Sequence, residues 1–484
     1  MAGTSSSDNG QVLLHYGSGN LADCWILKLD GNGNLVWQKT LGGTNNDVAF
    51  SITKTIDGGY AVAGFSASND SDVTGHHGTS ATDDYWVVKL DSNENMQWEK
   101  SLGGTGDDWA YSVIQTTDHG YAIAGYSDSN DGDVNGNHGN GDEWIVKLDS
   151  TGVIQWSRTL GGSGSEQARS IIQSSDGGYV VVGETASNDG DVIGYHGDTT
   201  VQFWEPDYWI VKLDGAGNIQ WQKALGGTST DQAYSILQTS MGDYVVAGQS
   251  GSNDGDVTFN HYAFDYWIVK LDGTGNILWQ NSFGGTGSDE ARSVAQSSDG
   301  GFVVTGISTS NDGDVTGQHG NGGIVGTTDY WVVKLDSVGS MQWQKSLGGN
   351  FNDWAYSAIQ VDYESYVVAG GASSQDGDVT GNHDGDDFWV VKLGAPLGIN
   401  QPVNSFFKIS PNPGTGIFQI QNSSSPIQTA EAFNLLGEKV FSTSNFSHRT
   451  AGQTSNSIDL STEPDGVYFL HLKTGEGIME EGGY

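Results

Sequence analysis

The sequence predicts an all-β protein whose main part is a β-propeller. A tryptophan at the end of a strand-like run returns at intervals of 58 to 65 residues. Each interval contains four short runs of β-branched and aromatic residues, which is the number of strands in a propeller blade. No run has the periodicity of an amphipathic helix. The recurring residues are Trp37, Trp98, Trp156, Trp221, Trp279 and Trp343.

The four runs of one unit are AYSVIQT (110–116), GYAIAGYS (120–127), EWIVKLD (143–149) and VIQWSRTL (153–160). Each is bounded by Gly, Asp, Asn or Ser, and short turns such as DGNGN at residues 30–34 join the third run to the fourth, as in hairpins. Over the whole chain we count 26 runs, whereas seven complete blades would need 28. We therefore predict seven blades, with six or eight as alternatives and a β-solenoid as the other architecture.

The chain begins inside a repeat. Residues 6–20 read SSDNGQVLLHYGSGN and correspond to SSDGGYVVVGETASN at residues 174–188. We expect the second strand of the first unit in this segment, and we expect the first strand of the first unit and the fourth strand of the last to be missing. The opening residues MAGTSSSDNG lack the basic and apolar regions of a signal peptide, so we expect the sequence to be a fragment.

The composition excludes some classes of function. There are 59 acidic and 19 basic residues, for a formal net charge of −40, which argues against nucleic-acid binding. Such a charge suits a soluble surface or one that collects cations. No run of about eighteen apolar residues predicts a transmembrane helix. Cys24 is the single cysteine, so no intramolecular disulfide can form, and we expect it to pack as a small apolar residue.

A loop of the form SNDGDVxGxHG follows the second strand in six units. Two carboxylates two residues apart, a preceding amide and a glycine offer the hard oxygen ligands that Ca²⁺ prefers. The sequence therefore predicts Ca²⁺ as a cofactor, and the alternative is that these side chains close Asx-turns. The candidate ligands are Asp70, Asp72, Asp131, Asp133, Asp189, Asp191, Asp254, Asp256, Asp312, Asp314, Asp376 and Asp378.

Two further residue types recur once per unit. A histidine ends the same loop, and it either completes a His-Asp₂ transition-metal site or holds the loop by a hydrogen bond to a carbonyl or carboxylate. The copies are His77, His138, His196, His261, His319 and His383. A lysine occurs in every third strand, and we expect it to pair with the carboxylate that follows LGG. The expected partners are Asp47, Asp108, Glu166, Asp231, Asp289 and Asp353.

The segments that differ between units are the better candidates for function. The longest is GDTTVQFWEPD at residues 197–207, where Phe203 and Trp204 are candidate ligand-binding residues for a sugar or a protein. The alternative is that these two rings pack over a neighbouring blade. No catalytic set stands out, and we identify no blade with non-repeated charged residues directed inward.

Two propeller resemblances support the fold. The segment WIVKLDGAGNIQW at residues 209–221 resembles the strand–turn–Trp repeat of quinoprotein and outer-membrane-assembly propellers. A quinone cofactor would follow only if the central cofactor residues were present, and we identify none. The segment DGGYVVVG at residues 176–183 resembles repeats of secreted bacterial propellers of unassigned function.

The composition changes at APLGINQPVN. We divide the chain into a propeller at residues 1–395, a linker at 396–404 and a C-terminal module at 405–484. The blocks FKISPNPGTGIFQI, AEAFNLLGEKVFST and IDLSTEPDGVYFLHLKTGEG closely resemble the type A C-terminal sorting domain of Bacteroidota type IX secretion cargo. The resemblance implies a small Ig-like β-sandwich, the type IX secretion machinery as partner, and a secreted or outer-cell-surface location. The ending GIMEEGGY departs from the family's basic, apolar last strand.

Together these observations predict an exported propeller that binds or adheres rather than catalyses, with a polysaccharide or a protein as ligand. One alternative is a secreted enzyme with its site at the central channel, such as a polysaccharide hydrolase or lyase or a quinoprotein. The other is a purely structural repeat of a surface protein.

Overall fold

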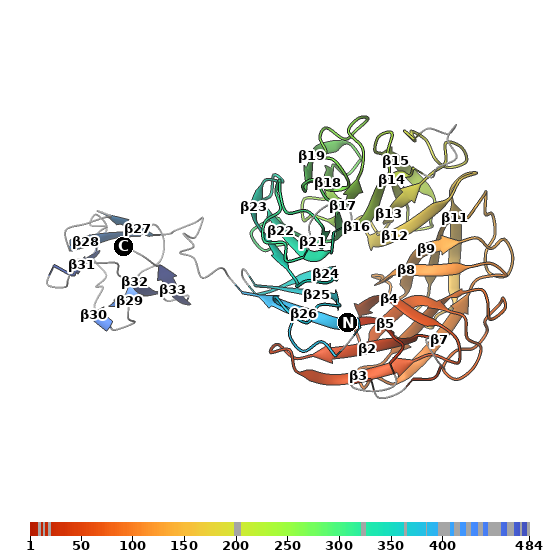
Figure 1. Ribbon diagram of the computed structural model, residues 1–484, viewed down its shortest axis with the longest axis horizontal. Coiled ribbons are helices and arrows are strands. Elements are labelled where there is room, and N and C mark those ends of the chain that lie inside the picture. Colours follow the sequence, from red (N-terminus) through yellow and green to blue (C-terminus); the bar gives the residue numbers. More distant parts are fainter. Residues whose placement is uncertain are drawn as a thin grey trace. The chain divides into compact units, whose positions relative to one another are not determined.

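The chain folds into two compact units, Met1–Leu393 and Gly394–Tyr484. Figure 1 shows the computed structural model, in which the described residues form strands and turns and no helix. The described residues are 1–7, 11–12, 15–17, 21–197, 205–320, 326–362, 365–383, 385–394, 407–410, 417–422, 427–433, 439–443, 456–461, 469–474 and 477–481.

The first unit is a ring of seven antiparallel sheets, which we number as blades 1 to 7 (Figure 1). The predicted seven-bladed propeller is confirmed. Blades 2 to 6 have four strands, and the described residues give blades 1 and 7 three each, which matches the count of 26.

The strand bounds follow the repeat closely. Blade 1 holds β1 (Ala2–Ser5), β2 (Asp23–Leu29) and β3 (Leu35–Leu41). Blade 2 holds β4 (Asp47–Lys54), β5 (Tyr60–Ser66), β6 (Asp84–Leu90) and β7 (Met96–Leu102). Blade 3 holds β8 (Asp108–Gln115), β9 (Tyr121–Ser127), β10 (Asp142–Leu148) and β11 (Ile154–Leu160). Blade 4 holds β12 (Glu166–Gln173), β13 (Tyr179–Thr185), β14 (Asp207–Leu213) and β15 (Ile219–Leu225).

The remaining blades repeat this order. Blade 5 holds β16 (Asp231–Gln238), β17 (Tyr244–Ser250), β18 (Asp265–Leu271) and β19 (Ile277–Phe283). Blade 6 holds β20 (Asp289–Gln296), β21 (Phe302–Ser308), β22 (Asp329–Leu335) and β23 (Met341–Leu347). Blade 7 holds β24 (Asp353–Asp362), β25 (Ser365–Ala372) and β26 (Asp387–Leu393). The first strands of consecutive blades, from β4 to β24, contact one another, so they surround the central channel.

The seams between blades are built from the third strands, which are almost fully buried in blades 2 to 6. In blade 2 the Tyr85 ring lies 4.6 Å from the Trp144 ring of blade 3, and its hydroxyl donates to the Trp144 carbonyl at 2.8 Å. Such aromatic pairs add stability beyond the area that they bury. The ring closes by an equivalent contact, because Phe388 of blade 7 stacks on Trp25 of blade 1 at 4.9 Å.

Blade 1 differs from the prediction. β1 pairs with β2, with Gly3 opposite Trp25, as Gly64 is opposite Trp86 in blade 2. The place of the second strand is therefore taken by Ala2–Ser5, and the expectation that it lies within residues 6–20 was wrong. The match at residues 6–20 was out of register. Residues 2–7, AGTSSS, correspond to AGFSAS at residues 63–68, which include the end of β5, and this alignment agrees with the pairing of β1 with β2.

The partners assigned to the repeated lysines were also wrong. Lys89 donates to Asp57 of the DGGY turn at 2.8 Å, and this hydrogen bond contributes most to lowering the pKa of Asp57 to about 2. Lys89 lies beside the start of β5, opposite Ala61, whereas Asp47 lies opposite Ser66 at the other end of that strand. The other pairs are Lys147–Asp118, Lys212–Asp176, Lys270–Asp243, Lys334–Asp299 and Lys392–Asp362.

The second unit contains two antiparallel sheets, in the orders β27-β28-β31 and β30-β29-β32-β33. An all-β module of two sheets agrees with the β-sandwich that the resemblance implies. The strands are β27 (Phe407–Ser410), β28 (Ile417–Asn422), β29 (Ile427–Phe433), β30 (Lys439–Thr443), β31 (Asn456–Asp459), β32 (Phe469–Thr474) and β33 (Gly477–Glu481).

Candidate functional site

Six bulges line the central channel. In each innermost strand from β4 to β24 the register shifts after an alanine that recurs in all six strands, so one residue is extra, as between Ala49 and Ser51 in β4. A bulge re-aims the side chain of the extra residue and often lies next to a functional site. The glycine opposite permits it, because a Cβ on Gly64 would lie 1.8 Å from the Val48 carbonyl oxygen. The extra residues, here called the channel ring, are Phe50, Tyr111, Arg169, Tyr234, Arg292 and Tyr356.

Neighbouring members of the channel ring touch around the axis. The centroids of the Phe50 and Tyr111 rings are 5.0 Å apart. The Arg169 guanidinium lies 4.5 Å from the centroid of Tyr111 and 5.9 Å from that of Tyr234. On the other side, the Arg292 guanidinium lies 4.6 Å from the Tyr356 centroid. Guanidinium groups at these distances are attracted to the ring faces, which restrains their planes.

A polar network joins the channel ring to blades 4 and 5. Arg169 donates to Glu184 at 3.0 Å, and the Arg169 Nε–H has no partner among the described residues. Gln232 donates to Glu184 and accepts a hydrogen bond from Gln249 at 2.6 Å. These hydrogen bonds join blade 4 to blade 5, and the groups that form them are a guanidinium, a carboxylate and two amides, all of which are planar.

Blade 6 carries a second ion pair. The Arg292 Nε–H and Nη2–H donate to the two oxygens of Glu290 at 2.9 and 3.3 Å. This fork geometry fixes the orientation of both groups. The Arg292 and Glu290 side chains are 20% and 18% exposed, so they are open to the channel.

These charges correct the sequence analysis, which identified no blade with non-repeated charged residues directed inward. Arg169 and Arg292 stand where other units have Tyr or Phe, and Lys54 stands where the other five innermost strands have Gln. All three cations come from innermost strands. The signal was visible when the copies were aligned, but the bulge that turns the side chains toward the channel could not be found in one sequence.

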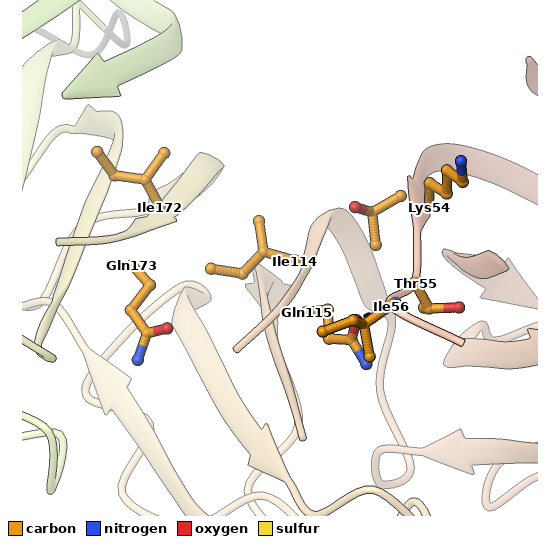
Figure 2. A pocket seen from close by; sticks show the side chains of 8 residues that line it. Lys54, Thr55, Ile56, Ile114, Gln115, Ile172 and Gln173 are labelled. Carbon is orange, nitrogen blue, oxygen red and sulfur yellow. Dashed lines mark hydrogen bonds between the residues drawn. The ribbon is translucent and has the colours of Figure 1, made fainter. Parts of the chain in front are cut away.

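A cavity of about 620 Å³ lies where three innermost strands end. Figure 2 shows Ile114 and Ile172 directed into the space between the strand ends, and Gln115 beside Ile56. The Ile56 amide donates to the Gln115 side chain at 2.8 Å, so the neighbouring blades are joined at this rim. Lys54 is the charged side chain of the lining.

One seam contains an unmatched residue. Glu143 stands where blades 2, 4, 5 and 6 have tyrosine, and it is fully buried. Neither of its carboxylate oxygens has a partner among the described residues. Burial, together with the nearby Glu166, Asp142 and Glu184, raises the pKa of Glu143 well above its ordinary value. A carboxyl in such surroundings is held in its neutral form.

Each predicted metal-binding loop is tied to the LGG loop of its blade. Asp70 accepts from the Thr44 amide at 2.9 Å and from its hydroxyl at 2.9 Å, whereas Asp72 accepts from the Gly42 amide at 3.3 Å. The two carboxylates of one loop therefore contact different residues. In the described residues no three His, Cys, Asp or Glu side chains form a group that could hold a metal ion. Ca²⁺ binding by these loops stays a prediction.

The loop histidines hold the seams. His77 Nδ1 lies 2.9 Å from Asp84, the first residue of β6, and its Nε2 lies 3.6 Å from Asp133 of the next blade. A hydrogen bond to a carboxylate is what the second alternative for these histidines predicts. The same Nδ1 contact joins His138–Asp142, His196–Asp207, His261–Asp265, His319–Asp329 and His383–Asp387.

Paired carboxylates are buried beside these histidines. Asp84 and Asp108 are fully buried and lie on either side of Gly103. Asp108 accepts from the Gly104 amide at 2.9 Å and from the Ser129 hydroxyl at 2.9 Å, yet burial dominates and raises its pKa to about 7. In six blades the Oδ1 atom of the first third-strand aspartate has no partner among the described residues. These residues are Asp23, Asp84, Asp142, Asp207, Asp265 and Asp329.

The remaining candidates, Phe203 and Trp204, lie outside the described residues. Their proposed role in ligand binding stays a prediction.

The C-terminal unit has a family match. Residues 408–481 match the family described as "Secretion system C-terminal sorting domain". These residues are a sorting domain. The resemblance found in the sequence is thereby confirmed, and the sorting domain marks the chain for export to the cell surface or for secretion by the type IX machinery. Among the described residues, no helix has the length and apolarity needed to cross a membrane.

The propeller is similar to one curated relative at low identity. It is 27% identical over 160 residues to "Regulatory protein FlaEY" of Caulobacter vibrioides, a match that covers 32% of this chain and 17% of that protein. The chain thus matches about a sixth of the relative's length.

Solved structures give weaker similarities. Sqt1 from Chaetomium thermophilum has a TM-score of 0.38 at 12% identity, with 88% of this chain and 79% of that chain covered. A PQQ-bound aldose sugar dehydrogenase from Streptomyces coelicolor has a TM-score of 0.34 at 11% identity, with 71% and 93% covered. A putative 6-phosphogluconolactonase from Bacteroides fragilis has a TM-score of 0.39 at 10% identity, with 84% and 89% covered. These scores carry no argument about function.

Proposed function

We propose that the chain is an exported binding module whose ligand, a polysaccharide or a protein, occupies the central channel. One observation carries this proposal. The seams use the same residues in nearly every blade, whereas the channel ring changes between Phe, Tyr and Arg and is joined to non-repeated Glu and Gln residues. Binding sites are expected where a rigid scaffold presents residues that differ from the repeat.

The sorting domain supports a role outside the cell, and adhesion is the form of binding that suits display at the surface. Release of the propeller into the medium would suit capture of a soluble ligand. Fractionation of cells that express the chain with its natural export signals separates the two locations.

The test uses the folded chain on arrays of glycans and of surface proteins. We expect wild type to bind and Arg169→Ala to lose at least about tenfold in affinity, as for a central interface arginine. Lys345→Ala, on an outer strand, is the matched control. Binding that is unaffected by Arg169→Ala and Arg292→Ala would place the site elsewhere. A chain that binds neither class of ligand would favour the structural alternative.

The second candidate function is a secreted enzyme that acts on polysaccharide. The Arg–Glu pairs of blades 4 and 6 favour it, because non-repeated charged residues at the channel are what an enzymatic site predicts. Release of new reducing ends or unsaturated products from a polysaccharide, lost in Glu184→Gln and in Glu290→Gln, would establish activity. Intact polysaccharide after prolonged incubation would contradict it.

A further inference from the structure

The channel has two unlike walls. The wall of blades 2 and 3 is aromatic, and its rings form a continuous ladder: Phe50–Phe65 at 5.7 Å, Phe65–Trp109 at 6.2 Å and Trp109–Tyr126 at 5.4 Å between centroids. Phe50 is 46% exposed. An exposed ring at the head of a packed ladder offers a flat apolar surface to a ligand.

Blade 7 extends the aromatic wall. Tyr356 is 56% exposed, although the nearby Arg292 guanidinium fixes one side of its ring. Phe50 belongs to blade 2 and Tyr356 to blade 7, the two blades on either side of blade 1.

The opposite wall, in blades 4 to 6, is polar. Beside Tyr234, it contains the Arg169–Glu184–Gln232–Gln249 network, in which the fully buried Glu184 holds Arg169 and Gln232, and the Arg292–Glu290 pair. Guanidinium and amide groups donate, and carboxylate and amide oxygens accept, so donors and acceptors alternate along this wall. A hydroxyl group needs both at once, because it donates one hydrogen bond and accepts others.

The charges of the channel and of the whole chain limit which ligands the channel can bind. Each channel arginine is matched by a glutamate at about 3 Å, so the polar wall presents little net charge. The chain as a whole carries −40, which repels a polyanion at long range. The wall therefore suits an uncharged ligand with many hydroxyl groups better than a phosphate or a uronate.

We infer that the ligand of the central channel is an uncharged saccharide, whose apolar ring face stacks on the aromatic wall while its hydroxyls bond to Arg169, Gln232 and the Arg292–Glu290 pair of the opposite wall. This inference rests on the proposed function, because it names the ligand class of the same site. Each propeller binds one saccharide segment, because the two walls differ and so fix one orientation of the ligand.

The experiment measures binding by isothermal titration with neutral gluco-, manno- and xylo-oligosaccharides and with oligouronates of the same lengths. We expect at least one neutral series to bind and the oligouronates to bind more weakly. Phe50→Ala and Arg292→Lys should each weaken binding about tenfold or more, because Lys keeps the charge and loses the planar fork. The controls are Phe351→Ala, at an exposed ring on an LGG loop, and Tyr262→Ala, at an exposed ring on a loop after a second strand.

The outcomes separate the two proposals. Tighter binding of oligouronates than of neutral chains overturns the inference, and so does an absence of neutral-saccharide binding at millimolar concentration. If a protein ligand binds instead and the channel variants abolish that binding, the proposed function stands and the saccharide inference fails. If neutral saccharides bind equally to the channel variants and the controls, the channel is not the site and the proposed function fails. Circular dichroism and melting of each variant show whether it folds.

Discussion

The seams and the central channel of this propeller follow opposite rules. A seam repeats one set of side chains: a buried third-strand Trp, a Tyr beneath it, a loop His and paired carboxylates. On each innermost strand the channel-ring residue lies only a few residues after the seam carboxylate, yet its type changes from blade to blade. Repetition marks the residues that hold one blade to the next, and variation marks the residues that a ligand would meet.

The largest expected contrast is between a seam tryptophan and a channel aromatic. Trp331 is fully buried and packs 4.5 Å from Tyr266, so Trp331→Ala should lower the free energy of unfolding by about 3–5 kcal/mol. Phe50→Ala, at a half-exposed ring, should cost about 1 kcal/mol. Urea unfolding followed by tryptophan fluorescence measures both. Equal losses would contradict the division between seam and channel.

Glu143 is a seam residue that differs from the repeated tyrosine, and replacing it tests how this difference affects stability. Glu143→Tyr restores the repeated residue, removes a buried carboxyl without a partner, and allows a hydroxyl bond to the Trp209 carbonyl. We expect the free energy of unfolding to rise by about 1–3 kcal/mol. Glu143→Gln, which keeps the size, should give a smaller gain. A destabilised Glu143→Tyr propeller with weakened ligand binding would instead assign Glu143 to the channel.

The seam carboxylates and the lysine pairs predict opposite pH dependences. Burial raises the pKa of Asp108 to about 7 and of Asp47 to about 6, so the folded state holds protons that the unfolded state releases, and stability should fall as pH rises from about 4 to 7. Lys89 helps to hold the pKa of Asp57 at about 2, so the stability from that pair is lost as pH falls from about 4 through 2.

Calorimetry between pH 2 and 8 should therefore find the highest melting temperature near pH 4, and Asp108→Asn should reduce the decline toward pH 7. A melting temperature that rises steadily from pH 4 to 7 would contradict the protonated seams.

The smallest expected effect concerns the acidic loops. If they bind Ca²⁺, the metal raises the melting temperature by stabilising the folded state, and a chelator reverses the shift. Asp131→Asn combined with Asp133→Asn should remove one site of six and so reduce the shift by about a sixth. An unchanged melting temperature would contradict Ca²⁺ binding. The acidic loops would then have only the structural role of holding the LGG loops by hydrogen bonds.

Much of the fold could be predicted because each unit repeats a local pattern. Strand alternation, turn residues and the Trp period predicted four strands per blade and seven blades. The Lys89–Asp57 pair could not be found this way, because it depends on which end of β6 lies beside which turn. The position of β1 was missed for a different reason, because residues 6–20 were aligned out of register with the other units.

The candidate site also contains residues that the sequence suggested and residues that only the structure revealed. The acidic loops attracted attention because their residue types suit metal binding, but the structure brings Asp70 to Thr44 and Asp72 to Gly42 instead of to each other. Arg169 and Arg292 had no motif to mark them. The pairing of β12 with β13 places Arg169 beside Glu184, and the bulge in β20 places Arg292 beside Glu290.

The sequence by itself determined the all-β class, the four-stranded unit and the sorting domain, and it favoured seven blades, because these depend on short patterns within single units or modules. The tertiary structure alone decided which carboxylate pairs with which lysine and which side chains face the channel. These depend on strand register, bulge position and contacts between residues far apart in the chain, such as Lys89 and Asp57, which are 32 residues apart. A one-residue shift in register turns a side chain to the other face.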